Sequence, residues 1–149
     1  MKGSSVVRIM AYEQTSRAAS IDEQQKDSKR IDVMFLCDEW KSSKGGLFTF
    51  NREIAVNLAK TTSDSINVHC YVAQSDELSR ADARQHGVQL ITARSIPGSS
   101  EPFDWLKIPP PELPNPDIVV GHGRKFGTLC LFYFPNCKVQ VDAFCSCVL

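Results

Sequence analysis

The sequence predicts an α/β protein with a three-layer, Rossmann-like fold: a mostly parallel sheet of about five strands with helices on both faces. Three observations predict it. Short apolar runs alternate with amphipathic segments of helix length, glycine-rich turns follow two of those runs, and a proline-rich connection separates the third run from the fourth. Strands that alternate with helices pair in parallel through right-handed crossovers, which place helices on both faces.

Length and composition fit one globular domain. The chain has 149 residues, of which 42% are hydrophobic and 23% charged, and Lys+Arg and Asp+Glu both total 17. The resulting net charge of zero indicates no preference for nucleic acid or for an anionic membrane. No apolar run approaches the ~20 residues of a membrane span, and the first 30 residues lack the apolar core of a signal peptide. We therefore expect a cytoplasmic protein without a membrane span.

The first half of the chain predicts a polar leader followed by a βαβαβ unit. Residues 1–29 are rich in Ser, Gln, Glu, Asp and Lys, which is typical of a disordered leader. Apolar residues recur at helical spacing from Leu47 to Leu58, and Ser75 or Asp76 can cap a polar helix that stops at Gly87. The expected elements are the strands Ile31–Cys37, Ile66–Ala73 and Val88–Ile91 and the helices Phe48–Lys60 and Glu77–His86.

The second half begins with a long connection, Arg94–Pro116, which holds most of the chain's eight prolines. Proline lacks the donor that a central strand needs, so we expect a loop with at most one helical turn, Phe103–Lys107, and with Trp105 as its anchor to the core. A strand at Asp117–Val120, a helix ending near Phe134 and a strand at Lys138–Asp142 follow. The domain should therefore span residues 30–142, with 143–149 as a short tail.

The first glycine turn, Lys44-Gly45-Gly46, lies between a buried strand and an amphipathic helix. A helix N-terminus offers unpaired N–H groups and partial positive charge, and paired glycines let a phosphate or sugar oxygen approach them. We favour such a contact at Gly45 and Gly46 over a turn without a ligand. Lys44 would either add positive charge to a phosphate or be a solvated loop lysine.

His122 follows the expected fourth strand and stands between Gly121 and Gly123, which should leave its ring unobstructed. This setting suits a hydrogen bond to a sugar hydroxyl or a phosphate, and we favour that role over a structural histidine. His69 and His86 have no comparable setting.

Two further groups of residues are expected to carry no chemistry. Asp38 and Glu39 are neighbours in an extended chain and point to opposite faces, so they cannot readily share one reacting atom. A single carboxylate that contacts a hydroxyl-bearing ligand stays an alternative to solvated loop charge, which we favour. Cys37 and Cys70 fall in buried strands, where cysteine acts as a small apolar residue. Four more cysteines lie in the last 20 residues, at positions 130, 137, 145 and 147, and their spacing favours reduced thiols over a zinc site. No catalytic residue, metal or cofactor is predicted.

The second glycine turn is also similar to a dinucleotide fingerprint. Gly121 and Gly123 follow a strand, and Asp142 ends the next strand about 20 residues on, where an acid would bind the ribose. However, Phe126 occupies the third glycine position, Gly127 comes one residue late, and the turn follows the fourth strand instead of the first. A dinucleotide-binding domain that uses Gly121, Gly123 and Asp142 therefore stays an alternative.

Two stretches are similar to motifs of a known family. Lys44-Gly45-Gly46-Leu47 leads into the helical segment Asn51–Ala59, and Pro116-Asp117-Ile118-Val119-Val120 leads to Gly121-His122-Gly123. With them, the chain from Ile31 to Val141 resembles the N-terminal half of a GT-B-fold glycosyltransferase of the family 4 type. The resemblance implies that Gly45 and Gly46 offer amides to the donor diphosphate or the acceptor. It also implies that His122 lies near the transferred sugar, and that the reaction retains configuration through positioning and leaving-group stabilisation.

The sequence departs from that family after Asp142, where only seven residues follow. The family's second Rossmann-like domain supplies most of the nucleotide-sugar pocket, so the resemblance implies a truncated domain with half a cleft and no measurable transfer alone. One hypothesis is an acceptor-side, glycosyltransferase-related domain that binds a sugar nucleotide, a phosphate or a sugar acceptor and is completed by a protein partner. The alternative is a non-catalytic interaction module that kept the fold. Neither predicts a nucleic-acid partner.

Overall fold

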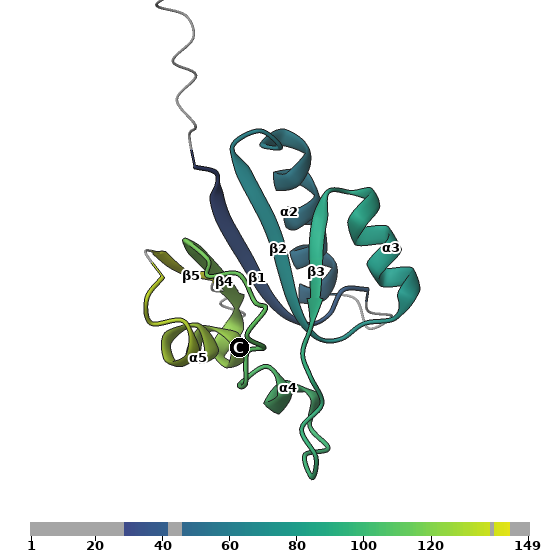
Figure 1. Ribbon diagram of the computed structural model, residues 1–149, viewed down its shortest axis with the longest axis vertical. Helices are drawn as coiled ribbons and strands as arrows, with labels where there is room; N and C mark the ends of the chain where they lie inside the picture. Colours follow the sequence, from purple (N-terminus) through teal and green to yellow (C-terminus); the bar gives the residue numbers. More distant parts are fainter. Residues whose placement is uncertain (1–28, 42–45, 138, 144–149) are drawn as a thin grey trace, which may run out of the picture.

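The computed structural model describes residues 29–41, 46–137 and 139–143. These form an α/β fold with five strands (Figure 1). In chain order the elements are β1 (Ile31–Glu39), α2 (Leu47–Thr61), β2 (Ile66–Gln74), α3 (Glu77–Gln85), β3 (Val88–Thr92), α4 (Pro102–Trp105), β4 (Ile118–His122), α5 (Gly123–Tyr133) and β5 (Val139–Ala143). Residues 1–28 of the predicted leader and 144–149 of the predicted tail lie outside the described residues, so those two assignments stay predictions. Ala143, predicted as the first tail residue, is the last residue of β5.

The sheet is parallel throughout, in the order β3-β2-β1-β4-β5. The chain moves outward from β1 to β2 and β3, then crosses back to place β4 on the other side of β1. In β1, Phe35 pairs with Cys70 of β2 and with Val120 of β4. This reversal of direction makes the gap between the carboxyl ends of β1 and β4 the place where such sheets bind ligands.

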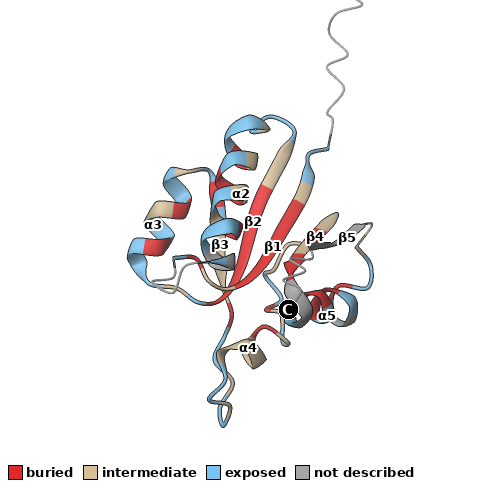
Figure 2. Ribbon diagram, turned by 180° about the vertical axis from the view of Figure 1, so that it is seen from behind, coloured by how far each residue is buried: buried red, intermediate tan, exposed pale blue. Residues whose placement is uncertain are grey.

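Helices cover both faces of the sheet, which confirms the predicted three-layer arrangement (Figure 2). On one face, α2 and α3 place Val56 and Ala83 against the β1 and β2 residues Phe35 and Val72. On the other, α5 places Leu129 in a cluster with further β1 and β2 residues, Leu36 and Tyr71 among them. Successive strand residues point to opposite faces, so two separate cores share one sheet.

Two element boundaries differ from the prediction at the carboxyl edge of the sheet. β1 continues beyond Cys37 to Glu39, and β4 continues to His122, after which α5 begins directly at Gly123. The expected second glycine turn is therefore not a loop. A Cβ on Gly121 would lie 2.7 Å from the carbonyl oxygen of Phe126, so glycine is needed here for α5 to pack closely on β4.

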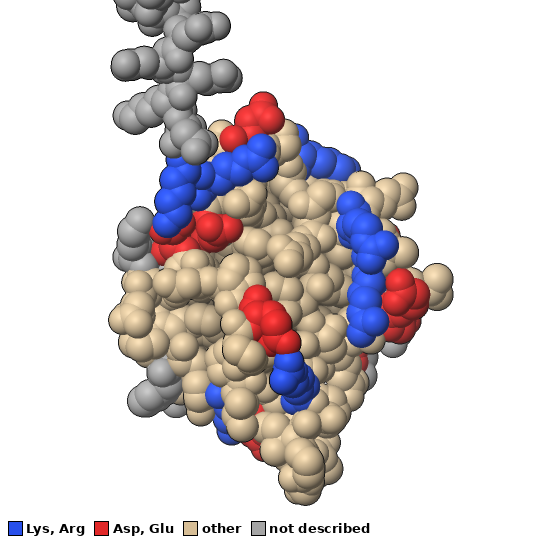
Figure 3. All heavy atoms as spheres, in the orientation of Figure 1, with Lys and Arg blue, Asp and Glu red and all other residues tan. Residues whose placement is uncertain are grey.

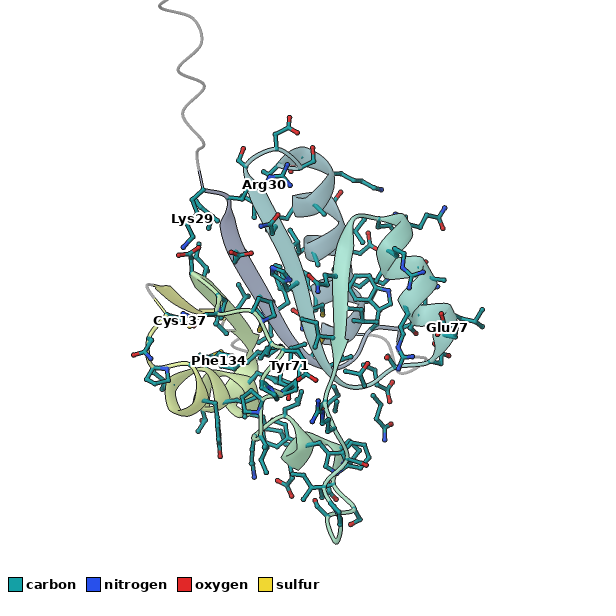
Figure 4. The ribbon with its side chains drawn as sticks, in the orientation of Figure 1. Lys29, Arg30, Tyr71, Glu77, Phe134 and Cys137 are labelled. Carbon is teal, nitrogen blue, oxygen red and sulfur yellow. The ribbon has the colours of Figure 1, made fainter. Side chains whose placement is uncertain are left out.

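The proline-rich connection is held by aromatic side chains, as predicted for Trp105. The indole Nε1 of Trp105 donates to the carbonyl of Ser99 at 3.3 Å, and the Tyr71 hydroxyl donates to the carbonyl of Ile108 at 3.5 Å. Burial raises the pKa of Tyr71 to about 12, so its hydroxyl stays protonated and remains a donor. Figure 4 shows Tyr71 and Phe134 on the same side of the sheet, where both belong to the α5-side core.

The sequence signals for the two ends of α3 are confirmed. The side chain of Asp76 accepts a hydrogen bond from the backbone N–H of Ser79 at 2.7 Å and caps α3, which ends before Gly87 with its φ of 75°.

Cys37 and Cys70 are both buried, and their sulfurs lie 3.2 Å apart. The hydrogen bond to Cys70, together with burial, raises the pKa of the Cys37 thiol, which keeps it protonated. No helix within the described ranges has both the length and the apolar character of a membrane span.

Candidate functional site

The structure brings the start of α2 and the end of β4 together at the gap between β1 and β4. Gly46 is the N-cap residue of α2, with φ 72° and ψ −130°, a conformation that suits glycine. One turn later, the ring of Phe50 packs edge-on against the ring of His122, with centroids 5.3 Å apart. The start of α2, where Gly46 is the N-cap, therefore lies near His122 at the end of β4.

His122 is less accessible than its sequence setting suggested. Its exposed fraction is 3%, whereas the adjoining Phe50 is 49% exposed. The prediction of an unobstructed ring is wrong, because the flanking glycines do not prevent α2 from placing Phe50 against it. A ligand that approaches the end of β4 would contact Phe50 before His122.

The other predicted site residues have less structural support. Lys44 and Gly45 lie outside the described residues. Gly123 is the first residue of α5. Asp142, which belongs to the dinucleotide alternative, pairs with Gly121 across β4 and β5.

A carboxylate that sequence analysis missed, Asp82 of α3, joins three elements beside the first glycine turn. Its Oδ2 accepts hydrogen bonds from Trp40 Nε1 at 2.8 Å and from Arg52 Nη2 at 2.8 Å, and its Oδ1 lies 3.0 Å from Lys41 Nζ. The guanidinium of Arg52 also stacks 5.6 Å from the centre of the Trp40 ring. Asp82 therefore fixes the end of β1 and the first turns of α2, which bound the 42–45 segment.

The electrostatics of Asp82 agree with this structural role. Burial by itself would raise the pKa of Asp82, but the hydrogen bonds from Trp40, Arg52 and Lys41 outweigh it and hold that pKa well below its ordinary value. Asp82 therefore stays ionised and bound to its partners. This suits a structural role better than that of a general base.

A groove of about 590 Å³ opens at the carboxyl ends of β1, β2 and β3. We call it the strand-end groove. Its lining includes Glu39, Gln74, Ser75, Thr92, Ser95 and Trp105. Because these residues follow β1, β2 and β3, the groove lies on the other side of β1 from His122.

The strand-end groove combines side-chain oxygens with an indole. Glu39 and Gln74 are register partners on β1 and β2, so their side chains stand next to each other. The hydroxyls of Ser75 and Thr92 lie 2.5 Å apart, and Trp105 forms an apolar wall. Carboxylate, amide and hydroxyl groups beside an aromatic ring suit a polyhydroxylated ligand. Sequence analysis did not predict this assembly, because its residues come from four separate segments.

Metal binding has no support in the described part of the chain, where no three His, Cys, Asp or Glu side chains gather as ligands would. Cys130 is buried, and Cys137 is partly buried. Positions 145 and 147 lie outside the described residues.

Comparison with known proteins finds one family. The model of a family described as Family 4 Glycosyltransferase in conflict systems matches residues 34–139. This range extends from within β1 to the start of β5 and includes both Gly46 and His122. No curated protein and no solved structure matches the chain.

Proposed function

Because this chain belongs to the family described as Family 4 Glycosyltransferase in conflict systems, we propose that it forms the acceptor-side wall of a sugar-transfer site. A sugar nucleotide contacts the start of α2, and the sugar acceptor occupies the strand-end groove. The observation that supports the proposal is the contact between Phe50, near the start of α2, and His122 at the end of β4, where β4 runs beside β1.

The start of α2 is the proposed diphosphate contact. The first N–H groups of a helix have no acceptor inside the helix and carry partial positive charge. The first turn of α2 contains no acidic residue, and Gly46 provides no side-chain cap, so no carboxylate of that turn competes with an anionic ligand. Gly45 and Gly46 let the diphosphate approach the backbone, and Lys44 adds a positive charge.

Asn51 supports a polar ligand near this turn. It follows Phe50 in α2 and is 3% exposed, and its side-chain oxygen has no hydrogen-bond partner among the described residues. An unsatisfied buried acceptor costs about 1–3 kcal/mol. A hydroxyl of the sugar nucleotide can donate the missing hydrogen bond to Asn51, whereas its ionised diphosphate cannot.

The acceptor sugar is proposed to stack on Trp105 and to hydrogen-bond with Glu39 and Gln74. His122 is proposed to contact a hydroxyl of the transferred sugar once Phe50 has moved aside. The resemblance to GT-B enzymes implies a second Rossmann-like wall opposite these groups. We propose that transfer requires that wall, and that the present residues bind substrates without turnover.

The test is a titration of the isotopically labelled chain with UDP-glucose and, separately, GDP-mannose, followed by two-dimensional NMR. We expect amide shifts at Gly46 and His122, with saturation in the millimolar range. If neither nucleotide sugar shifts these amides at up to about 10 mM, the sugar-nucleotide site is excluded and the non-catalytic interaction module is favoured.

A matched pair of glycine variants makes the titration specific. Gly46 and Gly98 both have positive φ, 72° and 86°, and a Cβ at either would meet nothing within 4 Å. Both alanine variants therefore carry backbone strain without a clash. Gly46→Ala should weaken the nucleotide-sugar response at least about threefold, while Gly98→Ala, in the proline-rich connection, should leave it unchanged. Equal effects of both variants would contradict a contact at Gly46.

A further inference from the structure

Among the described residues, the edge strand β3 has a hydrogen-bonded neighbour on one side only. The sheet order ends at β3, which pairs with β2. The backbone N–H of Ala93 donates to the carbonyl of Val72 at 2.8 Å, so Ala93 faces β2. Backbone groups of successive strand residues alternate in direction, and Thr92 and Leu90 therefore direct their N–H and C=O groups outward. A row of outward-facing backbone N–H and C=O groups can form hydrogen bonds with another strand.

Hollows lie on both faces of this edge. One, of about 380 Å³, lies between β3 and α3 and is lined by Arg84 and Val88. The other, of about 370 Å³, lies between β3 and the proline-rich connection and is lined by Arg94 and Pro110. Arg80 lines both hollows. A strand added beside β3 would place alternate side chains in the two hollows, because successive side chains point to opposite faces.

The charge around β3 is basic. Three guanidinium groups, those of Arg80, Arg84 and Arg94, face two carboxylates, Glu77 at 3.5 Å from Arg80 and Glu112 paired with Arg94. The side chains of both pairs are at least 45% exposed, and exposed pairs of this kind are weak and exchange readily with other anions. Within the described residues, Arg84 has no ion pair. Figure 3 shows the basic side chains along the margin that α3 forms in Figure 1.

We propose that β3 binds an extended, acidic peptide segment of another protein, which adds to the sheet as a sixth strand. The backbone of the peptide pairs with Leu90 and Thr92, and its carboxylates enter the hollow beside Arg80 and Arg84. Its alternate, uncharged side chains lie in the other hollow, where Arg94 is already paired with Glu112. A second copy of this chain fits less well, because β3–β3 pairing would bring the same arginines together. The surface is separate from the strand-end groove and from the gap beside His122.

The test uses a fluorescein-labelled peptide, Glu-Val-Glu-Val-Glu-Val, and the change in its fluorescence anisotropy when the full chain is added. We expect binding with a dissociation constant below about 1 mM and no binding of the Lys-Val counterpart. N-methylation of either all Glu or all Val amides separates strand addition from charge attraction, since only one set faces β3. One N-methylated peptide should lose binding and the other should keep it; equal affinities of the two would overturn the proposal.

Charge-reversal variants locate the binding site. Arg84→Glu should weaken binding about fivefold or more, the upper end of what an exposed ion pair contributes. Lys29→Glu makes the same charge change far from α3, as the positions of Lys29 and Glu77 in Figure 4 show, and should have no effect. Equal affinities of the two variants, or a concentration-dependent dimer in sedimentation that Arg84→Glu abolishes, would also overturn the proposal.

Discussion

Gly46 and Gly121 both flank the candidate site, but each is required for its own physical reason. A Cβ on Gly46 would meet nothing within 4 Å, and the constraint there is the positive φ of 72°. A Cβ on Gly121 would lie 2.7 Å from the carbonyl oxygen of Phe126 and 2.8 Å from the sulfur of Cys130. Gly46 is thus constrained by backbone conformation and Gly121 by the space between β4 and α5.

Gly121→Ala is expected to lower the free energy of unfolding by about 1–3 kcal/mol, because α5 must move away from β4 to admit a methyl group. Urea denaturation measures this change. Adding Cys130→Ala removes the sulfur but not the carbonyl of Phe126, so the double variant should not recover stability. Full recovery would show that the sulfur alone sets the spacing.

Among the secondary-structure elements, β1, α2 and α3 are joined through Asp82. This carboxylate has a side-chain exposure of 17%, and it binds Lys41 at the end of β1 and Arg52 in α2. Because β1 and α2 flank the 42–45 segment, the contact limits how far the proposed phosphate site can open. Asp82 acts as a positioning residue for that site.

Asp82→Asn is expected to destabilise the protein by about 2–3 kcal/mol, since it removes the charge that strengthens the bonds from Trp40, Arg52 and Lys41. Glu77→Gln in the same helix is the matched control. Glu77 is 76% exposed and pairs only with Arg80 at 3.5 Å, so its loss should cost less than about 0.5 kcal/mol. Comparable losses of free energy for the two variants would show that Asp82 has no special role.

For the whole molecule, several carboxylates link stability to pH. Bonds to Ser79 hold the pKa of Asp76 below its ordinary value of 3.8, and the bond from Lys107 does the same for Asp104. The pKa of Asp82 is lowered further. A carboxyl group with a lowered pKa in the folded state stabilises that state at pH values above the ordinary pKa. The stabilisation is lost as the pH falls through the folded-state pKa.

We therefore expect the free energy of unfolding to decline below about pH 5 and to continue declining to about pH 2. Urea denaturation at a series of pH values checks this. Asp82→Asn should show a shallower decline than the wild type, because it lacks the most strongly shifted carboxyl group. The same dependence of the free energy of unfolding on pH in both proteins would mean that groups other than Asp82 cause the loss of stability at low pH.

Much of the fold was predictable from local patterns. Apolar runs located all five strands to within about two residues, and Asp76 and Gly87 marked the ends of α3 correctly, because capping and glycine stops depend on neighbouring residues only. The extension of β4 through His122 was missed. Glycines beside His122 indicated a loop, whereas Gly121 serves the close packing of α5.

The candidate site was only partly predictable. Gly46 and His122 were proposed as site residues because each follows an expected strand, and strand ends of a parallel sheet share one edge. Their roles stay predictions. The Asp82 contacts and the strand-end groove were not recognised. Asp82 is 42 residues from Trp40, and no spacing rule connects residues so far apart in the sequence.

The sequence by itself determined the α/β class, the parallel sheet and the edge at which a ligand would bind, since periodicity and turn chemistry are local properties. Only the tertiary structure decided what surrounds that edge. It buried His122 behind Phe50, placed Asp82 against β1 and α2, and left β3 at the edge of the described sheet between two hollows. These features depend on contacts between distant segments, which exist only once the strands have taken their order in the sheet.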